Sequence, residues 1–478
     1  MSNHNFKVLV VEDEGDISHH IKSIFTGIDD RVEVIIAESR NQAFGFLDNP
    51  DLFFDFITLD LQIPIENDSF EKSSKHGLAV LSRCRLMAQG TPLLIFTGTS
   101  TVDMIAEFLA SSHNSDVWAE GRSRSTIDHL PKTKMVEFRE KVTGIVNAVL
   151  SLSDIELNYY SGSLPIDHDR LIRIFTKNQR GSRAQVNKIG GGLSNAKVYL
   201  VHVTNETGAT VHSAIAKCGP MKDISEDAGN YDSKINMLRP EVTPRKIQHI
   251  EFSAMSNSGV FYGLAAGYDH SFFKSVEKGV ITSTIRECIS GMLDRWHATS
   301  SQQRISIKTI RQKLVDDETS ESLKKQYGLD WANGFEKSKV QANIGCFHCD
   351  LHGENILINT DKSSATLIDY GDVSEGPITL DPITLECSFL FHPDTIKYEW
   401  PTKTDIESWE NINKYIENCP IAEDIRFCRE WSNRIGAGPR ELAACLYSYS
   451  LRQLKYEDTN KEVALNLLQA SKRIYDQS

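Results

Sequence analysis

The chain has 478 residues, of which 40% are hydrophobic and 24% are charged, and its formal net charge is −13. This length is enough for roughly two to four domains, and the composition is typical of a folded protein rather than of a disordered chain, a collagen or a coiled coil. The acidic balance argues against a surface that binds nucleic acid of any sequence, because such a surface has to be basic.

Three features of the sequence indicate the cellular compartment of the protein. The sequence contains no run of about 18 apolar residues, so we expect no transmembrane helix and no membrane partner. Its first residues lead directly into a strand pattern, without the charged, apolar and small segments of a signal peptide. The 9 cysteines are odd in number and scattered, which favours reduced thiols over a disulfide framework. We therefore expect a cytoplasmic protein.

The first part of the chain alternates strand and helix patterns. Short apolar runs predict strands over residues 6–11, 31–37, 54–61, 91–98 and 125–132. Helical stretches lie between them, including 16–25, and the segment 135–150 closes this part with apolar residues at helical spacing. Repeats of this kind predict a parallel sheet with helices on both faces. The functional residues of such a sheet gather at the carboxyl ends of its strands.

The remainder of the chain has a different pattern. We interpret residues 153–183 as a linker followed by the entry segment of a second domain, 184–478. Its sheet-like part has strand patterns over 184–203 (interrupted by a glycine turn), 210–220, 248–254 and 259–264, with a helix predicted over 223–238. After residue 280 we expect mostly helices, apart from strands near 356–359 and 365–368, and two amphipathic helices at the end, 439–456 and 461–478.

A set of polar residues falls at the predicted strand ends of the first part. The set consists of Glu12, Asp13, Asp60, Thr97 and Lys132. Three carboxylates that converge repel each other unless a cation binds, and Mg²⁺ prefers oxygen ligands. One carboxylate could then attack a phosphoryl donor, while the metal and the lysine offset the charge on the transferred group. A single acid at a strand end would mean little, since polar strand ends are common.

The motifs VLVVEDE, TLDLQIP, IFTGTS and HLPKTK make residues 1–152 resemble the receiver domain of two-component response regulators. The resemblance implies a CheY-like α/β fold, a doubly wound five-stranded parallel sheet. It also implies that a sensor histidine kinase phosphorylates Asp60, that Glu12 and Asp13 bind Mg²⁺ together with Asp60, and that Thr97 and Lys132 form the switch.

Three features depart from the receiver pattern. The loop after Asp60 is long, with residues 64–77 between the acid and the next helix pattern. His129 stands where receivers often carry an aromatic switch residue, and Thr133 replaces the usual proline after the lysine. These departures concern how a signal leaves the domain more than whether Asp60 accepts a phosphoryl group.

A second constellation lies in FHCDLHGENILIN (347–359) and LIDYGD (367–372). Asp350 can accept a hydroxyl proton, while Asn355 and Asp369 can bind Mg²⁺, and this set is the minimum for kinase chemistry. Upstream, Lys217 ends a strand pattern where a lysine that contacts nucleotide phosphates belongs. The glycine turn before it holds Gly191, Gly192 and Ser194, whose backbone N–H groups can meet phosphates. A glycine turn alone is a weak signal.

The order of these motifs, with H-x-D-L-H-x-x-N-I-L at its centre, resembles the aminoglycoside phosphotransferase and choline kinase branch of the protein kinase-like fold. The resemblance implies an α+β bilobal domain with an N-lobe over about 184–265 and a helical C-lobe over about 266–478. It further implies an ATP- and Mg²⁺-dependent kinase in which Asp350 is the base, Asn355 and Asp369 hold Mg²⁺ and Lys217 contacts ATP. The acid that pairs with Lys217 is Glu226 or Asp227, and Asp381 is a later acid.

Two weaker features have alternatives. Cys346 and Cys349 form a C-x-x-C that could bind zinc, but no second pair lies at ligand spacing, and the kinase-like loop accounts for both residues. Glu386 could face a cationic acceptor, although an acid on a solvated surface is the more common case.

Together the motifs predict a two-component signalling protein in which an Asp-phosphorylated receiver regulates a phosphotransferase that acts on a hydroxyl-bearing acceptor. We expect the receiver surface near Thr97 and His129 to transmit the signal. The main alternative is a catalytically silent scaffold that binds nucleotide and is switched by the receiver; another is a receiver that serves only for docking. A DNA-binding output ranks last, because no compact helix-turn-helix pattern follows residue 151.

Overall fold

The computed structural model describes residues 5–67, 69–98, 102–160, 162–189, 196–264, 267–268, 270–393, 395 and 399–478. Its contacts divide the chain into two compact units. Unit 1 comprises Met1–Ser225 and Lys246–Leu264, and unit 2 comprises Glu226–Arg245 and Ala265–Ser478. In the part of the chain that is described, no helix is long and apolar enough to cross a membrane.

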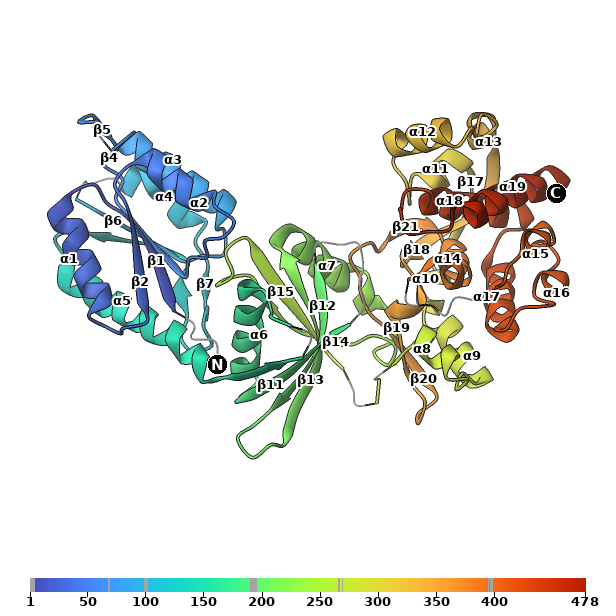
Figure 1. Ribbon diagram of the computed structural model, residues 1–478, viewed down its shortest axis with the longest axis horizontal. Helices are drawn as coiled ribbons and strands as arrows, with labels where there is room; N and C mark the ends of the chain where they lie inside the picture. The colour runs from blue at the N-terminus through green and yellow to red at the C-terminus, as the bar shows by residue number, and fades with distance from the viewer. Residues whose placement is uncertain are drawn as a thin grey trace. The chain divides into compact units, whose positions relative to one another are not determined.

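Unit 1 begins with the predicted parallel sheet (Figure 1). Its strands run in the order β2-β1-β3-β6-β9, and every neighbouring pair is parallel. The CheY-like doubly wound fold is therefore confirmed. The elements are β1 (Phe6–Val11), α1 (Gly15–Thr26), β2 (Val32–Ala37), α2 (Arg40–Leu47), β3 (Phe56–Leu59), β4 (Ile63–Pro64), β5 (Lys72–Ser73), α3 (Ser74–Met87), β6 (Leu93–Thr97), α4 (Val102–Ala110), β7 (Asn114–Ser115), β8 (Arg124–Ser125), β9 (Ile127–Pro131) and α5 (Met135–Leu150).

The sequence of β1 explains why this sheet is buried on both faces. Successive side chains of a strand point to opposite faces. Val8 and Val10 accordingly belong to one core cluster, and Leu9 and Val11 to another. A strand that is apolar on both faces needs helices on each side, which is the arrangement of parallel sheets.

The segment that we predicted as a linker is folded. Residues 153–183 contribute the end of a short 3₁₀ turn (η1, Ser151–Asp154), strand β10 (Glu156–Tyr159) and helix α6 (Ile166–Asn178). α6 is buried because Leu171, Ile172 and Phe175 are apolar, and the rings of Phe175 and Phe261 stack with centroids 4.1 Å apart. The segment therefore forms part of a packed domain rather than a free connection.

A six-stranded sheet completes unit 1, in the order β10-β11-β12-β13-β15-β14 (Figure 1). β10 joins its edge parallel to β11, whereas the β11–β12, β12–β13 and β13–β15 pairs are antiparallel. The further strands are β11 (Arg183–Ile189), β12 (Lys197–Thr204), β13 (Thr210–Pro220), β14 (Arg245–Ile250) and β15 (Asn257–Gly263). Its strands β11 to β15 fall in the range, about 184–265, over which the sequence predicts an N-lobe, and β10 precedes that range.

The receiver and this small lobe share one hydrophobic core, in which Phe6 and Phe138 belong to the same cluster as Phe175 and Phe261. Polar contacts reinforce it: Arg170 Nη2 on α6 lies 2.7 Å from Asp55 Oδ1 of the receiver, and both side chains are buried. The two regions therefore fold as one body.

Gly90 of the receiver contacts the loop between β14 and β15. Its backbone N–H donates to Met255 O at 2.6 Å, and its carbonyl accepts from Ser253 N–H at 2.7 Å. A Cβ at this position would lie only 2.7 Å from Glu251 O, so only glycine permits the approach.

Unit 2 carries two three-stranded sheets, β16-β19-β20 and β17-β18-β21, among helices. α7 (Met221–Ser233) begins in unit 1 and continues into unit 2. The other elements are η2 (Ile235–Met237), β16 (His270–Ser271), α8 (Phe272–Glu277), α9 (Ser283–Gly291), α10 (Asp294–His297), β17 (Ser301–Ser306), α11 (Ile307–Arg311), α12 (Asp317–Gln326), α13 (Ala332–Lys337), β18 (Lys339–Phe347), η3 (Gly353–Asn355), β19 (Ile356–Asn359), β20 (Ser364–Leu367), β21 (Ser374–Pro377), α14 (Leu380–Phe391), α15 (Lys403–Glu407), α16 (Ile412–Tyr415), α17 (Ala422–Ile435), α18 (Pro439–Gln453) and α19 (Lys461–Gln477).

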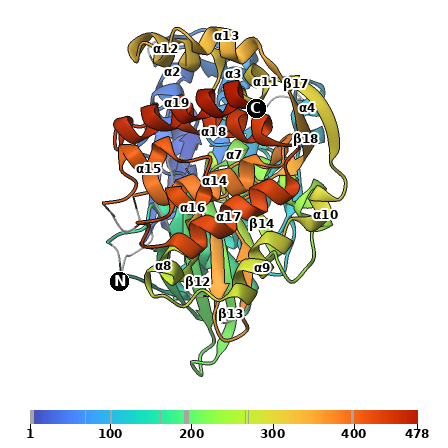
Figure 2. The ribbon, with the colours of Figure 1, turned by 90° about the vertical axis from the view of Figure 1, so that its right-hand side faces the viewer.

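The two C-terminal helices, α18 and α19, lie side by side (Figure 2). Helices dominate this unit as predicted, but the β17-β18-β21 sheet was missed. β17 has the polar sequence SQQRIS, which shows no apolar alternation, and β21 is only SEGP. Backbone pairing with β18, rather than a local pattern, makes these segments strands.

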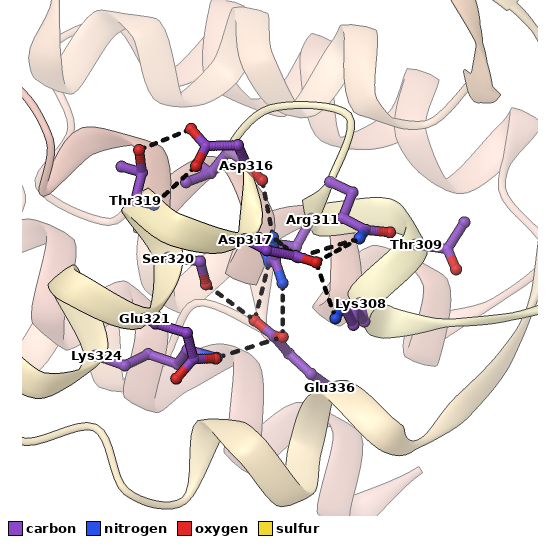
Figure 3. Close-up of polar contacts among 12 residues, drawn as sticks. Lys308, Thr309, Arg311, Asp316, Asp317, Thr319, Ser320, Glu321, Lys324 and Glu336 are labelled. Atoms are coloured by element: carbon purple, nitrogen blue, oxygen red, sulfur yellow. Dashed lines mark hydrogen bonds and ion pairs between the residues drawn. The ribbon is translucent and has the colours of Figure 1, made fainter.

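A buried ionic cluster connects the helices before β18. Arg311 Nη2 donates to Glu336 Oε2 at 2.9 Å, and Tyr447 Oη on α18 donates to Glu336 Oε1 at 2.9 Å. Figure 3 shows Arg311 between Glu336 and Asp317, with Lys324 on the far side of Glu336. Removing one member of such a buried set leaves an uncompensated charge, so this cluster holds α11, α13 and α18 together.

Candidate active sites

The carboxyl ends of the receiver strands form a polar pocket as the sequence predicts. Lys132 Nζ, just after β9, lies 2.7 Å from Asp60 Oδ2 and 2.7 Å from Glu12 Oε2. Asp60 follows β3 and Glu12 follows β1, and both are almost completely buried. Thr97 ends β6, and its carbonyl accepts the backbone N–H of Lys132 at 3.1 Å.

The donor set of this pocket fits Mg²⁺. Oxygen atoms of Glu12, Asp13 and Asp60 lie within 4.8 Å of one another. Asp13 Oδ1 is buried and has no hydrogen-bond partner among the described residues, and the same holds for Thr97 Oγ1. A hard cation with oxygen ligands satisfies a buried carboxylate oxygen of this kind.

The electrostatics of the pocket are those of a crowded acid site. Burial raises the pKa of Glu12 to about 7, although the hydrogen bond from Lys132 acts in the opposite direction. Burial acts to lower the pKa of Lys132, but its hydrogen bonds to Asp60 and Glu12 prevail and raise it. The lysine therefore stays charged beside the two acids.

A second lysine enters this pocket that the sequence did not reveal. The long loop after Asp60 folds back as a hairpin, in which β4 pairs with β5. Lys72 on β5 places its Nζ 2.6 Å from Asp13 Oδ2, and this hydrogen bond raises the pKa of Lys72. The unusual length of the loop was the only available signal.

The catalytic-type loop of unit 2 follows β18. Asp350 begins the loop, and the backbone carbonyl of Asp350 accepts Asn355 Nδ2 at 2.9 Å. Asn355 Nδ2 also contacts His352 Nε2 at 3.2 Å. Both contacts use the amide nitrogen, so Oδ1 of Asn355 is the atom that remains for a cation. An amide oxygen is one of the ligand types that Mg²⁺ accepts.

Asp381, at the start of α14, anchors the backbone at the beginning of this loop. Its Oδ2 and Oδ1 accept the backbone N–H groups of His348 and Cys349, at 2.8 and 3.1 Å. Burial raises the pKa of Asp381 to about 7 despite these hydrogen bonds. The acid that the sequence placed after the metal motif is thus a structural anchor of the loop.

Asp369 follows β20, where its backbone has a positive φ of 64°. The N–H of the preceding residue, Ile368, donates to Asn355 O at 3.0 Å. A non-glycine residue in this region of backbone space is uncommon and often marks a functional site. The backbone thus connects the loop of Asp350 and Asn355 directly to Asp369.

Of the two acids left open on α7, the structure buries Asp227 and exposes Glu226. Asp227 shares the inner helix face with Ile224, Ala228 and Tyr231, all of which are buried. This spacing was visible in the sequence, since positions three and four apart lie on one face. Asp227 is thus the inward acid of α7, while the assignment of Glu226 or Asp227 to the nucleotide site stays a prediction.

α7 also holds the segment after Asp369. Asp227 Oδ2 accepts the N–H of Tyr370 at 3.1 Å, and Asn230 Nδ2 donates to the carbonyls of Tyr370 and Gly371 at 3.1 and 3.0 Å. Lys234 Nζ donates to Val373 O at 2.6 Å. These bonds order the D-Y-G-D segment by its backbone.

The predicted nucleotide residues are only partly described. Lys217 lies in unit 1, on β13 of the small-lobe sheet, and its side chain is buried. It pairs in register with Val198 on β12 and Val260 on β15. The glycine turn residues Gly191, Gly192 and Ser194 lie outside the described residues.

Arg452 on α18 is a neighbour of Asp350 that sequence reasoning missed. Its Nη1 donates to Asp350 Oδ1 at 3.0 Å. Burial acts to raise the pKa of Asp350, but the pKa is lowered overall. The charge of Arg452 is the largest of the effects that lower it. No local motif connects a loop with a helix about a hundred residues later in the chain.

Two weaker candidates have structural roles. Glu386 is buried, not exposed to solvent or to an acceptor, and it pairs with Arg429, whose Nη2 lies 2.6 Å from Glu386 Oε1. Cys349 Sγ lies 3.6 Å from Lys313 O, and burial raises the pKa of both the Cys346 and the Cys349 thiol to about 12.

A comparison with family models and with curated proteins finds no match. A response regulator receiver domain protein from Clostridium thermocellum is 18% identical over 30% of this chain and 94% of its own, with a TM-score of 0.22. A thermostable mutant of aminoglycoside phosphotransferase APH(4)-Ia, in complex with ADP and hygromycin B, is 12% identical over 61% of this chain and 94% of its own, with a TM-score of 0.33. Spectinomycin phosphotransferase APH(9)-Ia, in complex with ADP and spectinomycin, is 13% identical over 61% of this chain and 92% of its own, with a TM-score of 0.32. The structural neighbours of this chain thus include receiver domains and aminoglycoside phosphotransferases.

Proposed function

We propose that the protein is a two-component signalling enzyme of the cytoplasm, in which phosphorylation of Asp60 regulates an ATP- and Mg²⁺-dependent phosphotransferase. The observation that carries the proposal is the backbone connection from Asp350 through Asn355 to Asp369. It brings a candidate base and two candidate metal ligands into one folded element, which is what phosphoryl transfer requires.

In the kinase step, Asp350 accepts the proton of the acceptor hydroxyl while Asn355 and Asp369 hold Mg²⁺. When bound, the metal offsets the charge of the transferred phosphoryl group. Lys217 contacts the nucleotide phosphates, with Gly191, Gly192 and Ser194 of the glycine turn beside them, and its partner acid is Glu226 or Asp227. The acceptor is an alcohol group of a small molecule or of a protein.

In the receiver, Asp60 is the phospho-acceptor for a sensor histidine kinase. Glu12 and Asp13 supply further oxygen ligands for Mg²⁺, Lys132 holds Asp60 in place, and Thr97 Oγ1 is free to donate to a phosphoryl oxygen. The buried oxygens of Asp13 and Thr97, which have no hydrogen-bond partner in the part of the chain that the structure describes, support this assignment.

The docking of the receiver on the small lobe suggests how the signal travels. Asp55 and Gly90, which make the contacts, precede β3 and β6, whereas Asp60 and Thr97 follow these strands. The signal therefore crosses the sheet from the carboxyl to the amino ends of its strands. The surface near Thr97 and His129, the other predicted output surface, lies toward the carboxyl ends of the strands.

The first test is transfer from labelled ATP with Mg²⁺, comparing wild type with Asp350→Ala. We expect transfer to the protein itself or to a metabolite pool, and its loss in the variant. Asp361→Asn, an exposed acid on the nearby β19–β20 turn, is the matched control. ATP binding without transfer in wild type would favour the silent scaffold instead.

Regulation needs a separate test. Wild type and Asp60→Asn are compared for ATP turnover before and after treatment with beryllofluoride, which mimics a phosphorylated aspartate. We expect turnover to change in wild type alone. Equal turnover in all four samples would remove the regulatory part of the proposal and leave the kinase part standing.

A further inference from the structure

Arg452 makes a contact with Asp350 that nothing in the motif requires. Asp350 and Arg452 lie on different elements, the loop after β18 and the last turn of α18. The guanidinium Nη1 lies 3.0 Å from Asp350 Oδ1, and both residues belong to unit 2. A charge-assisted hydrogen bond of this kind fixes the direction of a carboxylate more firmly than a neutral one.

A second hydrogen bond, to Tyr456, also orients the guanidinium group of Arg452. Arg452 Nε donates to Tyr456 Oη at 3.0 Å, one turn further along the chain. The side chain of Arg452 is only 18% exposed, and α18 is anchored by Tyr447 to Glu336. The planar fork of the arginine is thus held at Nε and Nη1 together, a geometry that a lysine cannot reproduce in full.

The other carboxylate oxygen is not held in this way. Asp350 Oδ2 lies 3.5 Å from His352 Nε2. Because Asn355 Nδ2 is a donor, Nε2 accepts from it and carries no proton of its own in that arrangement. One oxygen of Asp350 is therefore fixed by Arg452, whereas Oδ2 makes only the longer approach to His352 among the described residues.

We propose that Arg452 is a positioning residue of the phosphotransferase, which fixes the Asp350 carboxylate so that Oδ2 meets the acceptor hydroxyl. This inference rests on the proposed function of Asp350 as the base. Without Arg452 the carboxylate samples other rotamers, and a base displaced by about 1 Å loses rate steeply. The binding of ATP does not depend on this contact.

The test uses the full chain with the variants Arg452→Ala and Arg452→Lys, and Arg440→Ala as the matched control. Arg440 lies on the same helix and is exposed. We expect kcat for Mg²⁺-ATP turnover to fall about 100-fold in Arg452→Ala, as for a misplaced catalytic group, with KM for ATP unchanged. Arg452→Lys restores part of the rate, and added guanidinium ion in the millimolar range restores part of it to Arg452→Ala.

Two results would overturn the inference. One is wild-type turnover in Arg452→Ala. The other is a loss of turnover that neither lysine nor guanidinium relieves and that accompanies a lower melting temperature, since this describes a merely structural arginine.

A crystallographic comparison separates this inference from the proposed function. If wild type turns over no ATP, the proposed function fails, but the Asp350 side chain can still be compared between wild type and Arg452→Ala. A single rotamer in wild type and several in the variant supports positioning. The same single rotamer in both contradicts it.

Discussion

The receiver pocket and the catalytic-type loop both place a carboxylate beside a cation, but they are built differently. Asp60 Oδ2 lies 2.7 Å from Lys132 Nζ, and both residues follow strands of one parallel sheet. Asp350 Oδ1 lies 3.0 Å from Arg452 Nη1, which comes from a C-terminal helix. In a parallel sheet the carboxyl ends of the strands always lie at the same edge, so residues that follow the strands meet there. The approach of a distant helix depends instead on the packing of the whole unit.

The largest effect expected from this comparison belongs to Asp60→Asn. The receiver should lose all covalent phosphate after incubation with a phosphodonor, because the amide is no nucleophile, as intact-protein mass spectrometry would show. Asp51→Asn, at an exposed acid of the same domain, should keep it. Phosphate retained by Asp60→Asn would place the acceptor elsewhere.

The next effect tests whether Lys132 compensates buried charge. Lys132→Met leaves Glu12 and Asp60 without their cation, so we expect a loss of roughly 3–5 kcal/mol in the free energy of unfolding. Added Mg²⁺ should restore much of it, since the metal replaces the missing charge. Lys134→Met, at an exposed ion pair with Glu137, should change stability by less than about 1 kcal/mol. Denaturant titration with and without Mg²⁺ measures both, and insensitivity of Lys132→Met to the metal would contradict the Mg²⁺ site.

Glu441 is a third buried acid to set beside Asp60 and Asp350. Its hydrogen bonds come from neutral groups, whereas Asp60 and Asp350 each have a cation. Burial raises the pKa of Glu441 to about 7, against the bonds from Ala437 N–H, Thr379 Oγ1 and Asn343 N–H. The folded state thus binds this proton more tightly than the unfolded chain does. Its contribution to stability is complete below about pH 4.5 and is lost as the pH rises through 7, by up to roughly 3 kcal/mol.

Chemical denaturation of wild type and Glu441→Gln between pH 5 and 8 measures this contribution. The variant loses one hydrogen bond and is expected to be less stable at pH 5, but its stability should decline less toward pH 8. Parallel pH profiles for the two proteins would show that Glu441 does not titrate in this range.

The smallest expected effect concerns Lys72, the tethered cation at Asp13. Because its ammonium group occupies Asp13 Oδ2, Lys72→Met should bind Mg²⁺ about tenfold more tightly, which corresponds to about 1.4 kcal/mol. Lys75→Met, at an exposed lysine in the first turn of α3, is the control. Isothermal titration calorimetry decides the matter, and equal or weaker affinity in Lys72→Met would mean that Lys72 supports the metal site rather than competing with it.

The strands and the acidic cluster of the receiver could be predicted because apolar strand runs alternate with helical stretches and the acids directly follow the strands. The sequence also placed Asp350, Asn355 and Asp369 in one motif, where their separations are short. It could not reveal Lys72, which reaches Asp13 only after the loop has paired as β4–β5, or Arg452, which depends on the docking of α18. The helix α6 within 153–183 was not predicted, because the mixed composition of the segment hides its apolar face, which is covered only when the receiver and the small lobe pack against it.

The shared core around α6 has consequences for the evolution of this protein and for its limited proteolysis. A protease that cleaves near residue 152 would not release a stable receiver, because Leu171 and Phe175 are buried in a core that both parts supply. Exchange of the receiver for that of another protein would likewise leave an uncovered apolar helix on the small lobe. The two modules are therefore expected to be inherited, degraded and diversified as one body, with compensating changes on both sides of α6.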